Sequence, residues 1–181
     1  MGTSLFRSAD DLMVQYARYH RDRRNIATHF VGIPLIVFAA CVLMARAGVT
    51  VSGRHVTVAA VVWALTSVWY LTRGRLGLGL AVSAANGVLA LLAHAVAAVG
   101  AAAWLAVGLG AFVLGWMLQF AGHYYEGRKP AFVDDLTGLL VGPMFITGEA
   151  MFAAGLFRPL AEAIERAAGP THLRDLAHPV G

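Results

Sequence analysis

The sequence predicts an all-α integral membrane protein, a helical bundle of about four transmembrane helices preceded by a helix at the membrane interface. Of the 181 residues, 59% are hydrophobic and only 13% are charged, whereas soluble domains carry about 25% charged residues. The mean hydropathy is +0.67. The apolar residues gather in stretches of about the twenty residues that a helix needs to cross the hydrocarbon core. We therefore expect one membrane domain over residues 1–181.

The first expected element is an amphipathic helix over residues 9–24 that lies on the membrane surface. Its apolar side chains recur at helical spacing, and its arginines can meet lipid phosphates. Tyr16 and Tyr19 are of the residue type that favours the interface between lipid and water. This helix should precede a membrane-embedded bundle over 26–157 and a polar C-terminal tail over 158–181.

Four apolar stretches within the bundle are predicted to span the membrane, namely 26–47, 56–72, 76–100 and 101–122. The second is the shortest. A fifth stretch, 139–157, is apolar apart from Glu149 and contains Pro143. This stretch could span, re-enter or pack against the others, and the sequence leaves the three arrangements open.

Lysine and arginine are distributed unequally between the two sides of this bundle. The N-terminal region and the second and fourth connections carry nine, whereas the first and third connections carry two. The positive-inside rule then places the N-terminus and residues 123–135 in the cytoplasm. A composition rich in alanine, glycine and arginine is typical of a bacterial protein, so the inner membrane is the expected location. The basic residues form no stripe, which argues against nucleic-acid binding, and the oligomeric state stays open.

Metal-binding side chains flank the predicted spans. His20 and His29 lie where the chain enters the first span, and His123 and Glu126 lie where it leaves the fourth. The predicted topology puts all four on the cytoplasmic side at similar depth. Imidazole and carboxylate ligands together suit iron, zinc or manganese. The sequence therefore predicts a metal site that joins residues about a hundred positions apart.

Helical spacing adds two neighbours to this site. Gln119 lies four residues before His123, and Asn25 lies four residues before His29, so each pair shares one helix face. His20 and His29 are nine residues apart, which would place them on opposite faces of one continuous helix. Both can face the site only if the helix breaks between them, and we expect that break near residues 22–24.

Two blocks of residues resemble a known family of small membrane proteins, typified by the yeast endoplasmic-reticulum 2-hydroxy fatty acid dioxygenase. The similarity covers about residues 10–157 and is specific in the two blocks. The chain departs from the family at Arg21, where yeast-type members have a second histidine, and at Asp135, where they have asparagine. The first block contains Tyr19-His20, Asn25, His29 and Pro34, and the second contains Gly115-Trp116, Gln119-Phe120, Gly122-His123, Glu126, Arg128, Pro130-Ala131, Asp135-Leu136, Pro143 and Glu149.

The resemblance implies an Fe(II)-dependent alpha-oxidation, in which a 2-hydroxy fatty acid and O₂ give a fatty acid one carbon shorter. It also implies catalytic metal ligands at His20, His29 and His123, with Glu126 as a ligand or as a hydrogen-bonded orienting group. The partners would be the fatty acid, O₂ and the lipid bilayer. Residues expected to support the metal ligands or to contact the acid head of the substrate are Asn25, Gln119, Glu149, Arg24 and Arg128.

Other functions remain compatible with the same residues. A membrane-embedded zinc hydrolase that acts on lipids could use an identical ligand set. A small transport protein, a haem-binding protein or a lipid-binding scaffold without metal would need no catalytic site. Metal content separates these classes, because iron favours the dioxygenase, zinc favours the hydrolase and no metal favours the scaffold.

Overall fold

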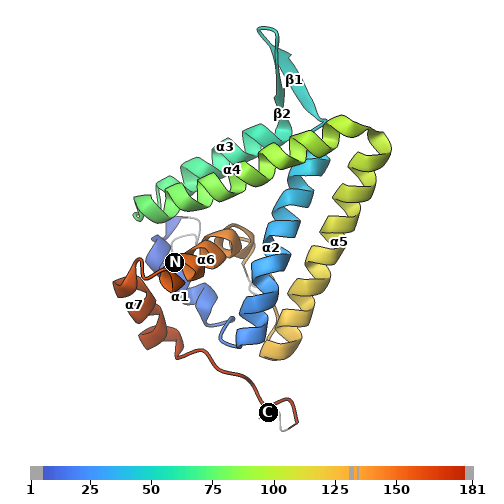
Figure 1. The fold of residues 1–181 in the computed structure, drawn as a ribbon. Helices are drawn as coiled ribbons and strands as arrows, with labels where there is room; N and C mark the ends of the chain where they lie inside the picture. The colour runs from blue at the N-terminus through green and yellow to red at the C-terminus, as the bar shows by residue number, and fades with distance from the viewer. Residues whose placement is uncertain (1–5, 131–132, 134, 178–181) are drawn as a thin grey trace. The chain divides into compact units, whose positions relative to one another are not determined.

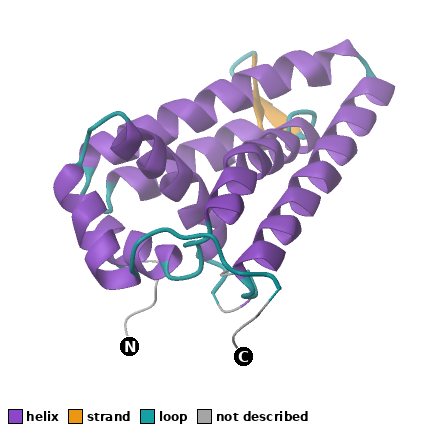
Figure 2. Ribbon diagram, turned by 60° about the horizontal axis from the view of Figure 1, so that its bottom comes forward, coloured by secondary structure: helices purple, strands orange, loops and turns teal. Residues whose placement is uncertain are grey.

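The computed structural model describes residues 6–130, 133 and 135–177. This part of the chain is almost entirely helical, with one short hairpin (Figures 1 and 2). The elements are α1 (Ala9–Ala17), α2 (Arg23–Met44), β1 (Gly48–Val51), β2 (Arg54–Thr57), α3 (Val58–Leu71), α4 (Leu76–Val99), α5 (Ala101–Glu126), α6 (Gly138–Ala153) and α7 (Arg158–Ala168).

The predicted fold class is confirmed. Among the described residues, α2, α4 and α5 are long and apolar enough to cross a membrane. The successive helices α6 and α7 would add a fourth span if counted together, but they bend by 116° at the break between them. The expected span over 56–72 is shorter than predicted, because α3 has 14 residues. Such a helix is about 21 Å long, less than the ~30 Å hydrocarbon core.

The hairpin formed by β1 and β2 was not predicted. Its strands pair antiparallel, with Val49 opposite Val56 and Thr50 opposite His55. Ser52 and Gly53 form the turn with φ of 50° and 78°. Positive φ at both central residues matches the turn that suits the twist of a two-residue hairpin. A Ser-Gly pair between alternating valines is a recognisable sequence signature of this element.

The helix expected over 9–24 is shorter than predicted and ends at Ala17. Ser8 caps its start, because the Ser8 hydroxyl accepts a hydrogen bond from the backbone N–H of Asp11. Tyr16 is buried among the helices, with 8% of its surface exposed, so its expected place at the lipid interface is wrong. Residues 18–22 form a turn, and the expected break between His20 and His29 is therefore present.

The chain divides into two compact units, and one of them is Gly32–Met117. Helices α3 and α4 pack closely in this unit, since a Cβ added at Gly79 would collide with the backbone of Tyr70. His94 on α4 shares a hydrogen bond of 2.8 Å with the hydroxyl of Thr57, which caps α3. The core of the unit consists of small and medium apolar side chains, namely Cys41, Val42, Ala59, Ala90 and Ala93.

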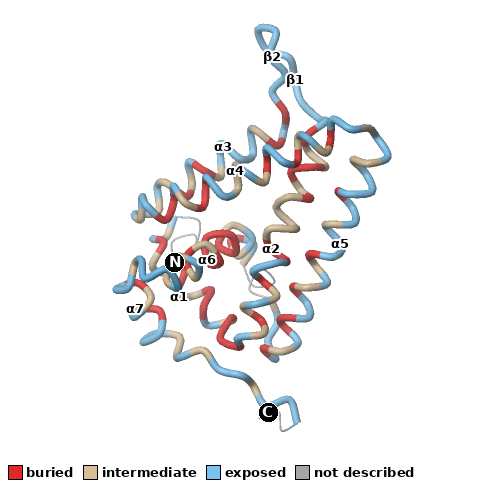
Figure 3. The backbone as a smooth tube through the Cα atoms, in the orientation of Figure 1, coloured by how far each residue is buried: buried red, intermediate tan, exposed pale blue. Residues whose placement is uncertain are grey.

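The other unit consists of Met1–Val31 and Leu118–Gly181. Within its described residues, α1 packs against both α6 and α7, and many positions of α1 and α6 are buried (Figure 3). The start of α2 and the end of α5 lie side by side here, because Gly122 of α5 faces Asn25, Thr28 and His29 of α2. This close approach brings together the two helix ends that carry His29 and His123.

Replacing Gly122 with alanine tests this approach. The added Cβ would overlap Thr28 Oγ1 and Asn25 Oδ1, so the two helix ends must separate. We expect Gly122→Ala to destabilise the protein by about 1–3 kcal/mol, measured as a lower unfolding temperature in detergent. Gly110→Ala on the same helix is the control, because nothing lies within 4 Å of its added Cβ. Equal stability of both variants would contradict the inferred close contact.

Candidate metal site

Three buried histidines from separate segments meet at one point. His20 lies on the turn after α1, His29 lies in the second turn of α2, and His123 lies near the end of α5. Each offers a ring nitrogen, and these atoms all lie within 4.8 Å of one another. The exposed fractions of the three residues are 0%, 1% and 7%. The predicted meeting of distant histidines is therefore observed, and this cluster could hold a metal ion.

Hydrogen bonds to backbone carbonyls assign the tautomers of His20 and His29. His20 Nδ1 lies 2.7 Å from the carbonyl oxygen of Tyr16, and His29 Nδ1 lies 2.9 Å from that of Asn25. Because a carbonyl oxygen only accepts, each Nδ1 carries the proton, which leaves each neutral ring with a lone pair on Nε2. A metal-binding histidine usually fixes its second nitrogen in this way.

The two Nε2 atoms face each other at 3.1 Å. With both protons on Nδ1, two lone pairs oppose at this distance, an arrangement that favours a proton or a cation between or beside them. His123 supplies another donor, because its buried Nδ1 has no hydrogen-bond partner among the described residues. The ring centroid of His123 lies 4.9 Å from that of His20 and 5.1 Å from that of His29. The donor set thus fits a divalent metal.

The surroundings keep His20 in the neutral form that binds metals. Burial lowers the pKa of His20 well below its ordinary value, and the neighbouring His29 and His123 lower it further. The Tyr16 ring stacks on the His20 ring at 4.0 Å between centroids, with 5° between the planes. Phe145 of α6 lies 5.5 Å from the same ring. Two aromatic side chains therefore shield this side of the cluster.

Glu126 is hydrogen-bonded to the turn that carries His20. Its carboxylate accepts from the backbone N–H of Arg21 at 2.9 and 3.0 Å and from that of Asp22 at 2.8 Å. It also accepts from the side-chain amide of Asn25 at 2.9 Å. Asn25 in turn donates to the carbonyl oxygen of Tyr19. These contacts attach the end of α5 to the turn between α1 and α2, and so hold His123 near His20.

The remaining predicted residues lie in different surroundings. Gln119 is buried on the same face of α5 as His123, and its Nε2 has no partner among the described residues. Glu149 lies 3.8 Å from the guanidinium of Arg21 and lines a cavity of about 160 Å³. Arg24 is bound to Asp22 at 2.7 Å, and Arg128 is exposed and donates to the carbonyl oxygen of Arg18. Gln119 thus shares the histidine face, whereas these arginines contact other partners.

Sequence reasoning missed three residues around the cluster. Tyr16 lies four residues before His20, and that helical spacing was the available sign of the stacked pair. Phe145 offers no such sign, because it is one apolar residue among many in α6. Asp22 was assigned to the chain break without a role, although aspartate before a helix is a capping signature. The structure shows that Asp22 caps α2, since it accepts from the backbone N–H of Arg24 at 2.8 Å.

Asp22 remains charged in these surroundings. Burial alone would raise the pKa of Asp22, but hydrogen bonds from Arg24 and Arg174 outweigh it and lower the pKa to about 2. Asp22 and Arg24 therefore form an ion pair beside the turn at neutral pH.

Glu126→Gln tests how much the carboxylate contributes. An amide keeps the shape of the side chain but turns an N–H₂ group toward donors that now meet oxygen. We expect about 10- to 100-fold weaker metal binding, as for other partners that orient ligands, measured by titration with Co²⁺. Glu162→Gln is the control, since Glu162 is exposed on α7 beside Arg166. Equal Co²⁺ affinities in the two variants would contradict an orienting role.

Comparison with known proteins agrees with this arrangement. Residues 6–154 match the family described as "2-hydroxy-palmitic acid dioxygenase Mpo1-like". The 2-hydroxy-palmitic acid dioxygenase MPO1 of Saccharomyces cerevisiae is 31% identical over 156 residues, which cover 83% of each chain. No solved structure matches the chain. By this similarity over most of its length, the chain belongs to the Mpo1-like family of 2-hydroxy fatty acid dioxygenases.

Proposed function

We propose that this chain is an Fe(II)-dependent dioxygenase that converts a 2-hydroxy fatty acid and O₂ to a fatty acid one carbon shorter. The observation that carries the proposal is the cluster of His20, His29 and His123, with two Nε2 atoms 3.1 Å apart. The yeast relative is named for action on 2-hydroxy-palmitic acid. The atoms of the reaction balance with carbon dioxide and water as the other products.

The three histidines would be the metal ligands in this proposal. Ferrous iron held by three imidazoles would leave positions for O₂ and for the carboxylate and hydroxyl of the substrate. Glu126 would act as the orienting group, because its two oxygens already accept hydrogen bonds from the turn and from Asn25. Gln119 and Glu149 would support the site from α5 and α6.

The charge of the site favours an acidic substrate. Three neutral imidazoles add no negative charge to a bound dication, and the Glu126 carboxylate is engaged by backbone N–H groups. An anionic chelator would therefore be bound more strongly than a neutral one. Of the two arginines expected to steer the acid head, Arg24 is bound to Asp22. We assign the steering role to the exposed Arg128.

The site would lie on the cytoplasmic side of the inner membrane of a bacterium. The support is the excess of basic residues in the N-terminal region and in the second and fourth connections. An acyl chain could then lie among the apolar helices while its acid head reaches the polar ends of α2 and α5.

Metal analysis tests the first part of the proposal. Protein purified anaerobically in detergent should contain about one iron per chain, and His123→Ala should contain none, because one of three ligands is lost. His55→Ala is the control, since His55 is exposed on the hairpin. Zinc in the unsubstituted protein would favour the lipid hydrolase instead. No metal after reconstitution with Fe²⁺ would overturn the proposal.

Product analysis tests the second part. With Fe²⁺ and O₂, 2-hydroxy-palmitic acid should yield the fatty acid with one carbon fewer, detected by mass spectrometry. Palmitic acid should not react, because it lacks the hydroxyl group that completes the chelate. His20→Ala should lose turnover. A product of unchanged chain length, or equal turnover of both acids, would exclude alpha-oxidation of the hydroxy acid.

A further inference from the structure

The turn between α1 and α2 carries His20 and is bonded along both of its edges. One edge faces Glu126, which accepts from the backbone N–H groups of Arg21 and Asp22. The other edge pairs with residues near the C-terminus, where Asp22 and His172 form a parallel β-bridge. The N–H of His172 donates to the carbonyl oxygen of Arg21, and the N–H of Arg23 donates to that of His172, each at 2.9 Å. The turn is thus held between two partners that are remote in the sequence.

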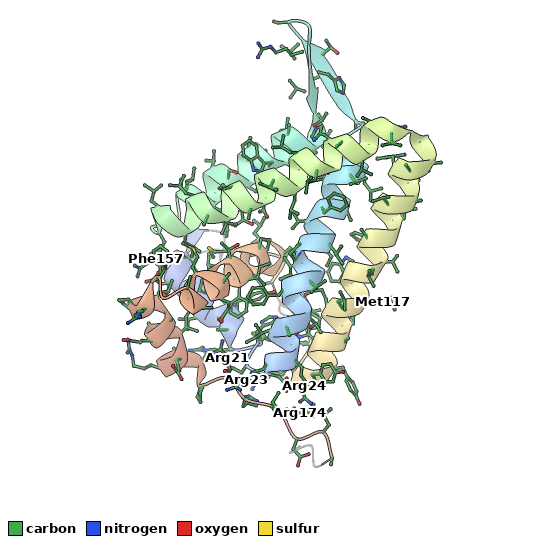
Figure 4. The ribbon with its side chains drawn as sticks, viewed as in Figure 1. Arg21, Arg23, Arg24, Met117, Phe157 and Arg174 are labelled. Atoms are coloured by element: carbon green, nitrogen blue, oxygen red, sulfur yellow. The ribbon has the colours of Figure 1, made fainter. Side chains whose placement is uncertain are left out.

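Side chains strengthen the second edge. The fully buried Asp22 carboxylate accepts from the backbone N–H of Arg174 at 2.8 Å and from the guanidinium of Arg24 at 2.7 and 3.0 Å. Arg24 also donates to the carbonyl oxygen of Arg174 at 2.7 Å. Arg21 donates to that of Gly169 at 3.0 Å. Figure 4 shows Arg21, Arg23, Arg24 and Arg174 gathered at the start of α2.

We infer that the segment Gly169–Arg174 is a positioning element of the histidine site, acting through the turn that carries His20. This inference rests on the proposed metal site. The segment touches none of the three histidines through the contacts described above, but it bonds to the residues that directly follow His20. It also lies beyond residues 6–154, the part of the chain that matches the family.

The physical reason is the tolerance of a metal site. Ligand atoms must be held within about 0.5 Å of their working positions, by groups whose own positions are fixed. His20 lies on an irregular turn, without a continuous helix to fix it. The turn is fixed instead by hydrogen bonds on its two edges, and loss of one edge would let it shift. The ring of His20 would shift with it relative to His29 and His123.

Arg174→Pro in the full-length protein tests the inference. Proline removes the N–H that donates to Asp22 and keeps the chain extended, which the segment already is. We expect about tenfold weaker Co²⁺ binding, the lower end of the effect of partners that orient ligands. The visible absorption spectrum of bound Co²⁺ should change as well, because the ligand geometry changes.

Leu176→Pro is the matched control, because it places the same residue two positions further along, outside the contacts with the turn. It should bind Co²⁺ like the unsubstituted protein, with the same spectrum. A segment that only stabilises the fold would lower the unfolding temperature of Arg174→Pro but leave affinity and spectrum equal to those of the control. That result would overturn the inference and leave the proposed function intact.

A second variant decides the matter if Arg174→Pro does not fold. Asp22→Asn retains a side chain able to cap α2 but weakens the bonds to Arg24 and Arg174. It should show a smaller loss of Co²⁺ affinity and the same direction of spectral change, and an unaltered affinity and spectrum would overturn the inference. If the unsubstituted protein binds no Co²⁺, the proposed metal site and this inference both fail.

Discussion

The arrangement of the site depends on one buried carboxylate, that of Glu126. In apolar surroundings a carboxylate without hydrogen-bond donors is strongly unfavourable, and here the donors are backbone N–H groups of Arg21 and Asp22 and the amide of Asn25. The N–H groups belong to a turn about a hundred residues away. Satisfying the carboxylate therefore fixes where the turn lies, and with it the position of His20.

The same requirement explains the small residue on the facing helix surface. The end of α5 can deliver both Glu126 and His123 only if it lies against the start of α2. Gly122 permits this, since its missing side chain leaves room for Asn25, Thr28 and His29. Close backbone approach at a small residue is also the usual way in which apolar helices associate in lipid, where the hydrophobic effect offers little. Packing and polar pairing thus act at the same place.

Periodicity and topology predicted much of this from the sequence, and local backbone geometry limited the rest. Helical spacing placed His123 and Glu126 on one face, and the charge distribution put His20, His29 and His123 on one side. The break that turns His20 toward His29 was expected, but its partners were not. Hydrogen bonds between Asp22, His172 and Arg174 join segments with no shared pattern, so no periodicity reveals them. The hairpin was missed although its Ser-Gly turn was visible.

The position of the cluster matches the two parts of a fatty acid. His29 and His123 lie at the polar ends of helices that are otherwise apolar, so the same helices that offer imidazole nitrogens also offer hydrocarbon-like surface. A soluble cleft would have to withdraw a long acyl chain from the membrane, with the loss of about 0.8 kcal/mol for each CH₂ group brought into water. A site at the ends of membrane helices avoids that loss. Its neutral imidazoles leave the charge of a metal to be balanced by an acid head, which is why this chemistry fits an apolar bundle.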